Sequence, residues 1–118
     1  NSKLYYFRDD KVMYVTPEQS EAHLKQTKID NAYNEKQTQL LGYDKKYEID
    51  EKVIALQAGD AFLLCSDGFW KQIDEMEMLI DLNKSQTTKE WIKHLLVRLI
   101  SRAKGKYDNY TVCGVIVR

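Results

Sequence analysis

The hydrophobic positions of this chain fall into short apolar runs near its two ends and in its middle, with helical patterns between the last two runs. Aromatic and β-branched residues flank a polar turn at 8–11, which predicts a β-hairpin formed by 4–7 and 12–15. The segments 61–65 and 111–117 are apolar on both alternating sets of positions, a pattern typical of strands covered on both faces. We therefore expect two central, buried strands.

A short helix is predicted to begin at Asp74, beyond the first buried strand and the residues 66–73 that follow it. Asp74 is a suitable N-cap, and Glu77 follows it at the spacing of a capping box. The apolar residues of this helix that we expect to face the core are Met76, Leu79 and Ile80.

A longer helix is predicted to begin at Thr87, with Glu90 completing a second capping box. Its apolar residues recur at helical spacing and form one stripe, which indicates a helix lying on a core: Trp91, Ile92, Leu95, Leu96, Leu99, Ile100 and Ala103. Further short elements are expected as a helix at 18–26 and as strands at 45–49 and 53–56, with a tight turn at 58–60.

Length and composition limit the classes of protein to consider. A chain of 118 residues suits one domain or part of one, and 43% hydrophobic with 31% charged residues is a normal soluble mixture. Basic and acidic residues balance at 18 each, so no basic field indicates nucleic acid. No apolar run approaches the roughly 20 residues of a membrane helix. We expect neither a nucleic-acid nor a membrane partner.

The two cysteines, Cys65 and Cys113, fall within the predicted buried strands, where a thiol behaves as a small hydrophobe. Two cysteines do not make a disulfide framework, so we expect a reduced, cytoplasmic protein. The chain starts at Asn1 rather than at Met, has no signal-like segment and enters a strand almost at once. We interpret it as a segment of a longer protein.

Two carboxylates lie where the buried strands begin and end. Asp67 follows the first strand and Asp108 precedes the second, so adjacent antiparallel pairing would bring both to the same end of a sheet. Carboxylate oxygens on rigid elements suit Mg²⁺ or Mn²⁺. Two such ions can activate a water molecule and hold a phosphoryl group. The pattern therefore indicates a metal-assisted hydrolase.

Simpler interpretations of the same residues exist. Ser66, Asp67 and Gly68 are also typical of an ordinary turn after a strand, and Asp108 with Asn109 is typical of a tight loop. A pair of carboxylates acting as acid and base on a sugar would need a cleft, and no cluster of aromatic and polar residues indicates one.

Taken together, these segments resemble the metal-dependent serine/threonine protein phosphatases of the type-2C (PPM) class. Residues 59–70, GDAFLLCSDGFW, resemble the strand that leads to the Ser-Asp-Gly metal motif of the family. Residues 107–112, YDNYTV, resemble its final Asp-Asn-x-Thr motif. Weaker similarities occur at 1–6, 16–20 and 41–42, so the match is collinear over the whole chain.

The resemblance implies an α+β fold: the C-terminal half of a four-layer α/β/β/α sandwich with antiparallel sheets. Residues 1–118 would form part of a catalytic domain whose N-terminal half is absent from this chain. Asp67 and Asp108 would be ligands of two Mg²⁺ or Mn²⁺ ions, supported by Ser66, Gly68 and Asn109. Water is the nucleophile in this family, so no side chain of the chain is assigned a catalytic role.

The chain also departs from the family pattern. Asn1 occupies the position of an aspartate linked to an additional metal, and a neutral amide is a poorer Mg²⁺ ligand than a carboxylate. Lys3 replaces an arginine of the pattern, and Glu18–Gln19 replaces Asp-His. The acidic motif and the Asp-Gly-x-Gly-Gly loop, which supply bridging ligands, are absent from these residues.

Three interpretations of function follow. In the first, the complete protein hydrolyses phosphoserine or phosphothreonine in signalling phosphoproteins with Mg²⁺ or Mn²⁺. In the second, it is a catalytically dead phosphatase-like module that acts in binding or regulation. An unrelated structural α/β domain leaves the joint spacing of the motifs unexplained. We expect the 118-residue chain alone to be inactive and to self-associate through exposed apolar sheet.

Overall fold

The computed structural model describes residues 1–17, 51–105 and 108–118. By its backbone packing the chain divides into two units, one of Ser2–Thr16 with Ala55–Arg118 and one of Asn1 with Pro17–Ile54. Every helix and strand that the structure describes belongs to the first unit. The predicted helix at 18–26 and the predicted strand at 45–49 lie outside the described residues.

The chain begins with the predicted hairpin. Strand β1 (Lys3–Arg8) pairs antiparallel with β2 (Lys11–Val15). Asp9 and Asp10 form the turn with φ angles of 50° and 60°, a left-handed conformation that matches the twist of two-residue hairpins and that aspartate tolerates. Thr16 prolongs the pairing, because its amide donates to the Leu4 carbonyl over 3.0 Å. The hairpin prediction is confirmed.

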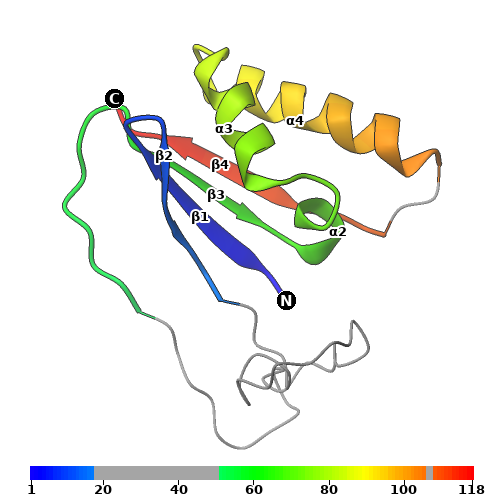
Figure 1. The fold of residues 1–118 in the computed structure, drawn as a ribbon, viewed down its shortest axis with the longest axis horizontal. Helices are drawn as coiled ribbons and strands as arrows, with labels where there is room; N and C mark the ends of the chain where they lie inside the picture. The colour runs from blue at the N-terminus through cyan, green and yellow to red at the C-terminus, as the bar shows by residue number, and fades with distance from the viewer. Residues whose placement is uncertain (18–50, 106–107) are drawn as a thin grey trace, which may run out of the picture. The chain divides into compact units, whose positions relative to one another are not determined.

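Four strands form one antiparallel sheet in the order β2-β1-β3-β4 (Figure 1). Strand β3 (Ala61–Cys65) pairs with β1 on one side and with β4 (Val112–Ile116) on the other. The turn before β3 is the predicted one: Gly59 has a φ of +91°, which glycine adopts without strain, and the Asp60 amide donates to the Gln57 carbonyl. The sheet therefore places β3 at its centre.

Three helices follow β3: α2 (Asp67–Trp70), α3 (Glu75–Asn83) and α4 (Thr88–Ala103). The capping box of Asp74 and Glu77 closes in both directions, as predicted. At α4, the Thr87 hydroxyl accepts from the Glu90 amide, but the Glu90 carboxylate accepts from the Gln86 amide instead of returning to Thr87. The second capping box is therefore only half formed.

Helices α3 and α4 lie over one face of the sheet (Figure 1). The hydrophobic core lies between these helices and the sheet. The Phe7 ring meets the Trp91 ring edge-on at 5.8 Å, and the Trp91 indole donates to the Met78 carbonyl over 3.0 Å. The predicted stripe of α4 supplies the buried residues Trp91, Leu95, Leu99 and Ala103. Full burial of each large apolar side chain stabilises the fold by about 1.5–3 kcal/mol.

The predicted inward faces of the helices are partly wrong. Met76 and Ile80 are 60% and 49% exposed, whereas Met78 and Leu79 are buried. Ile100 of α4 is also exposed. Helix α3 has apolar residues around most of its circumference, so periodicity alone does not select a face. Packing against α4 selects it, by turning Met78 and its neighbours inward.

The predicted double coverage of the two apolar strands is also wrong within the described residues. On the sheet face away from α3 and α4, Leu64 is 51% exposed and Val115 is 50% exposed. Strand β4 is an edge strand of this sheet rather than a central one. Side chains alternate between the two faces of a strand, and the described helices cover only one face. The predicted strand at 53–56 does not form.

The two cysteines lie on opposite faces of the sheet. Cys65 points to the helix-covered face and is buried, and burial raises the pKa of its thiol to about 12. Cys113 is exposed on the other face, so the prediction that both thiols are buried holds for only one of them. In the parts of the chain that the structure describes, no helix has both the length and the apolar character needed to cross a membrane.

Helix α3 is joined to α4 by a buried ion network. Asp81 is 0% exposed, and its carboxylate accepts from Arg98 Nε and Nη2 at 2.7 and 2.9 Å, with Lys84 Nζ 3.1 Å away. Burial raises the pKa of Asp81, but Arg98 and Lys84 outweigh it and hold the pKa below its ordinary value. Glu77 accepts from Arg98 and Arg102, and mainly the Arg102 hydrogen bonds lower its pKa to about 2.

A second buried carboxylate ties the start of β3 to β1. Asp60 accepts from Arg8 Nε and Nη2, both at 2.7 Å, and from the Gln57 amide at 2.8 Å. These hydrogen bonds, those of Arg8 above all, lower the pKa of Asp60 to about 2. Arg8 also donates to the Ala55 carbonyl, so the segment before β3 is held to the hairpin.

We predict that Arg98→Met destabilises the fold by about 2–4 kcal/mol, because it removes the main partner of a fully buried carboxylate. The free energy of unfolding in urea measures the loss. Lys93→Met is the matched control, since Lys93 is exposed on the same helix, and it should change stability by less than about 0.5 kcal/mol. Equal stability of the two variants would show that Arg98 does not stabilise Asp81.

Candidate functional site

The pairing of β3 with β4 brings the two motif loops together. Cys65 is registered with Val112, so the residues just beyond them meet at the same end of the sheet. The Ser66 amide donates to the Thr111 carbonyl at 3.0 Å, and the Thr111 amide donates to the Ser66 hydroxyl oxygen at 2.9 Å. The adjacency and antiparallel direction on which the predicted site depended are therefore confirmed.

Asp67 is the first residue of α2, directly after β3. The segment is a one-turn helix rather than a simple turn, with Ser66 in the N-cap position and Phe69 fully buried beneath it. The Asp67 side chain is 33% exposed, and Lys71 Nζ lies 3.8 Å from its Oδ2. The buried Phe69 fixes the helix, and the helix leaves one carboxylate accessible at its first turn.

Gly68 has a different role from the sharp turn that its sequence context suggested. Its backbone is helical, without a positive φ. A Cβ atom at this position would overlap the carbonyl oxygen of Asn109 and would lie 3.3 Å from the carbonyl oxygen of Asp108. The missing side chain therefore allows the second loop to lie directly against α2.

Asp108 and Asn109 form the other side of this contact. Both are exposed, and the Asn109 amide donates to Asp108 Oδ1 over 2.9 Å. This local hydrogen bond is the turn-like feature expected of an Asp-Asn pair. It leaves oxygen lone pairs of the Asp108 carboxylate available. The structure therefore brings the backbone of the loop with Asp108 and Asn109 against Gly68, next to Asp67.

The ligand atoms available at this end of the sheet are of the chemical type that a hard cation prefers. Asp67 and Asp108 supply accessible carboxylate oxygens, which Mg²⁺ and Mn²⁺ prefer. Within 1–17, 51–105 and 108–118, no three His, Cys, Asp or Glu side chains gather closely enough to hold a metal ion. Asn1 is exposed and lies two residues before Lys3, which is registered with Cys65. The assignment of Asp67 and Asp108 as ligands therefore stays a prediction.

Three residues around the site carry roles that the sequence did not assign. The backbone of Thr111 forms hydrogen bonds with Ser66. Thr111 is the last residue of the Asp-Asn-x-Thr motif, so the motif could have indicated this residue. Lys71 pairs with Asp67, a contact that their i,i+4 spacing could have indicated. Trp70 has Lys3 Nζ 3.8 Å above its ring, which depends on the pairing of β1 with β3 and has no sequence signal.

Comparison with known proteins shows which proteins this chain is similar to. The chain is 35% identical over 72 residues to the serine/threonine phosphatase stp of Listeria monocytogenes, an alignment that covers 61% of this chain and 28% of that protein. It is 29% identical over 120 residues to stp of Listeria innocua, covering 95% of this chain and 47% of that protein. The chain thus spans about half the length, or less, of the curated relatives it matches. No protein-family model matches it.

Solved structures share its fold. The S. agalactiae serine/threonine phosphatase superposes with a TM-score of 0.84 at 21% identity, over 100% of this chain and 51% of that one. The PPM Ser-Thr phosphatase MsPP from Mycobacterium smegmatis, solved with cacodylate, gives a TM-score of 0.74 at 22% identity, over 100% and 53%. The resemblance to PPM-type serine/threonine phosphatases and the α+β fold class are confirmed.

We predict that Gly68→Ala destabilises the fold by about 1–3 kcal/mol, because the new methyl group overlaps the Asn109 carbonyl. Alanine is otherwise the better helix former by about 0.5–1 kcal/mol, so a loss of stability must come from the loop contact. Urea unfolding measures the change. Gly105→Asn is the control, since Gly105 has open space around it and asparagine tolerates its φ of +78°. A stabilised Gly68→Ala variant would contradict the close approach.

Proposed function

We propose that this chain is the C-terminal part of the catalytic domain of a metal-dependent protein serine/threonine phosphatase. The observation that carries the proposal is the contact between the Ser66–Gly68 loop and the loop from Asp108 to Thr111. It presents two accessible carboxylates at one end of a rigid antiparallel pair. The similarity to curated serine/threonine phosphatases supports phosphoester hydrolysis as the reaction class.

Asp67 and Asp108 would hold Mg²⁺ or Mn²⁺ in the complete protein, and Gly68 provides the space that lets the two loops approach. Bound ions of this kind supply a water nucleophile at neutral pH and neutralise charge on the phosphoryl group. The residues of this chain would orient the metal ligands. Strand β3 and the buried Phe69 fix the direction of Asp67. Ser66 and Thr111 keep the second loop in place. The remaining ligands are expected from outside the described residues.

The substrate class that follows is phosphoserine or phosphothreonine in a signalling phosphoprotein of the cytoplasm. These assignments rest on the resemblance and on the names of the similar proteins. Neither nucleic acid nor membrane enters the proposal, because the balanced charge of the chain gives no basis for them. The alternative of a catalytically dead regulatory module rests on Asn1, which replaces a carboxylate of the family pattern.

In the complete protein, we predict that Asp67→Asn lowers Mn²⁺-dependent hydrolysis of a phosphothreonine peptide by at least about 100-fold, because it removes a metal ligand. Circular dichroism should show an unchanged fold, since Asp67 is partly exposed. Asp74→Asn is the matched control: asparagine also caps helices, and the activity should not change. Unchanged turnover of Asp67→Asn would remove this residue from the site.

The same assay separates the two functional hypotheses. The 118-residue chain alone should be inactive, since the described residues supply only two of the expected carboxylate ligands. Turnover by this chain at an enzyme-like rate would contradict the missing-ligand account. A complete protein without activity at any Mn²⁺ concentration would favour the regulatory module.

We also propose that the isolated chain self-associates through the sheet face opposite α3 and α4. Leu64 and Val115 are half exposed on this face, and Cys113, which is registered with Leu64, is exposed on it as well. We predict that sedimentation of the isolated chain gives the mass of two or more chains and that Leu64→Lys with Val115→Lys shifts it toward one.

Met76→Lys with Ile80→Lys is the control for this experiment. Both residues are exposed on α3, away from the proposed interface, and their replacement should leave the association unchanged. A monomeric wild-type chain, or an association that responds only to the α3 control, would contradict the role of the sheet face.

A further inference from the structure

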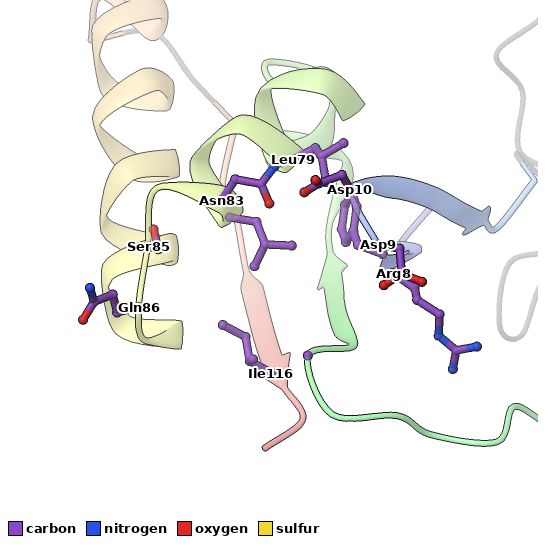
Figure 2. Close-up of a pocket in the computed structure, with 11 residues that line it drawn as sticks. Arg8, Asp9, Asp10, Leu79, Asn83, Ser85, Gln86 and Ile116 are labelled. Carbon is purple, nitrogen blue, oxygen red and sulfur yellow. The ribbon is translucent and has the colours of Figure 1, made fainter.

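A cavity of about 350 Å³ lies at the other end of the sheet from the two motif loops (Figure 2). It is formed by the turn of the β1–β2 hairpin, the C-terminal end of α3 and the loop between α3 and α4. Phe7 and Ile116 line it, and both are registered with Ala61, the first residue of β3. The motif loops adjoin Cys65, its last residue, so the cavity is separate from the candidate metal site.

The floor of the cavity is apolar and held in place by the core. Phe7 and Leu79 are buried, and Leu82 and Ile116 are partly buried against the same core cluster. The lining combines this apolar floor with polar groups in about equal measure, a combination that suits a small ligand with one apolar and one polar part. The floor would therefore cover a short apolar chain.

The rim carries negative charge. Asp9 and Asp10 project from the hairpin turn, and in the described part of the chain neither carboxylate accepts a hydrogen bond or forms an ion pair within 4.0 Å. Arg8 also lines the cavity, but its guanidinium points away from it in Figure 2 and is bound by both oxygens of Asp60. The net charge of the rim is thus that of two aspartates.

The end of α3 adds to this negative potential. Asn83, the last residue of the helix, lines the cavity, and the C-terminal end of a helix carries a partial negative charge. The last turn of α3 contains no basic residue. Lys84, the next residue, does not line the cavity and is paired with Asp81. The described structure therefore leaves the negative end of α3 without a cation at the cavity.

We propose that this cavity binds an organic cation, an ammonium or guanidinium group carried on a short apolar chain. The carboxylates of Asp9 and Asp10 would hold the cationic group, and Leu79, Leu82 and Ile116 would cover the apolar chain. A free amine and a lysine or arginine side chain of another polypeptide have this same chemistry. The proposal is independent of the phosphatase reaction.

Calorimetric titration of the complete protein tests the proposal with three probes. Agmatine represents a free amine with a guanidinium group, the peptide acetyl-Ala-Arg-Ala-amide represents a polypeptide side chain, and the guanidinium ion has charge without an apolar chain. We expect agmatine or the peptide to bind at least about tenfold more tightly than the guanidinium ion, because each buries methylene groups on the floor. The tighter of the two identifies the source, and added salt should weaken it.

Asp9→Asn with Asp10→Asn tests the charge. Asparagine also tolerates the positive φ of both positions, so the turn is kept while both charges are lost. The affinity of the tighter probe should fall about five- to tenfold, a change expected for partly exposed ion pairs. Glu51→Gln with Glu75→Gln removes two exposed carboxylates that do not line the cavity and should leave the affinity unchanged.

The two experiments also define what would overturn the proposal. Binding of neither agmatine nor the peptide at millimolar concentration would show that the cavity does not take this class of ligand. Equal affinity for the bare guanidinium ion, or an equal loss in both double variants, would show only a general attraction of cations to the protein. A retained affinity in Asp9→Asn with Asp10→Asn would place the binding elsewhere.

Discussion

The antiparallel pairing of β3 with β4 is the constraint on which the rest of the structure depends. The two strands are separated in sequence by α2, α3 and α4, yet Cys65 and Val112 are in register. Beyond this pair, Ser66 and Thr111 exchange backbone and hydroxyl hydrogen bonds. These bonds bring α2 and the Asp108 loop within van der Waals distance. Only a glycine at position 68 permits this approach, because a Cβ atom there would overlap the Asn109 carbonyl oxygen.

The three helices between these strands must return the chain to the same sheet, and two buried carboxylates help to hold it there. Asp81 joins α3 to α4 through Arg98, and Asp60 joins the start of β3 to β1 through Arg8. A buried carboxylate without its arginine would be costly, so each pair selects one arrangement of its elements. The sheet end with the motif loops and the opposite end with the cavity are thereby fixed relative to each other.

Much of the fold was predictable because it is encoded locally. The hairpin turn, the capping box of Asp74 and the stripe of α4 depend on residues close together in the sequence, and all three were found where expected. The predicted strand at 53–56 does not form, but most of the errors concern which face of an element is buried. Met76 and Ile80 were expected inside α3, and both strands were expected to be covered twice. An apolar side chain can be buried, but the elements that pack around it decide whether it is.

By itself, the sequence determined most of the elements, the order of the two motifs and the resemblance to PPM-type phosphatases, because these depend on residue type and spacing. Only the tertiary structure decided that the Asp67 and Asp108 loops touch, that Gly68 is needed for close packing rather than for a turn, and that an acidic cavity lies at the far end of the sheet. These features arise between segments distant in sequence. Strand pairing and side-chain volume determine them, and neither can be derived from local pattern.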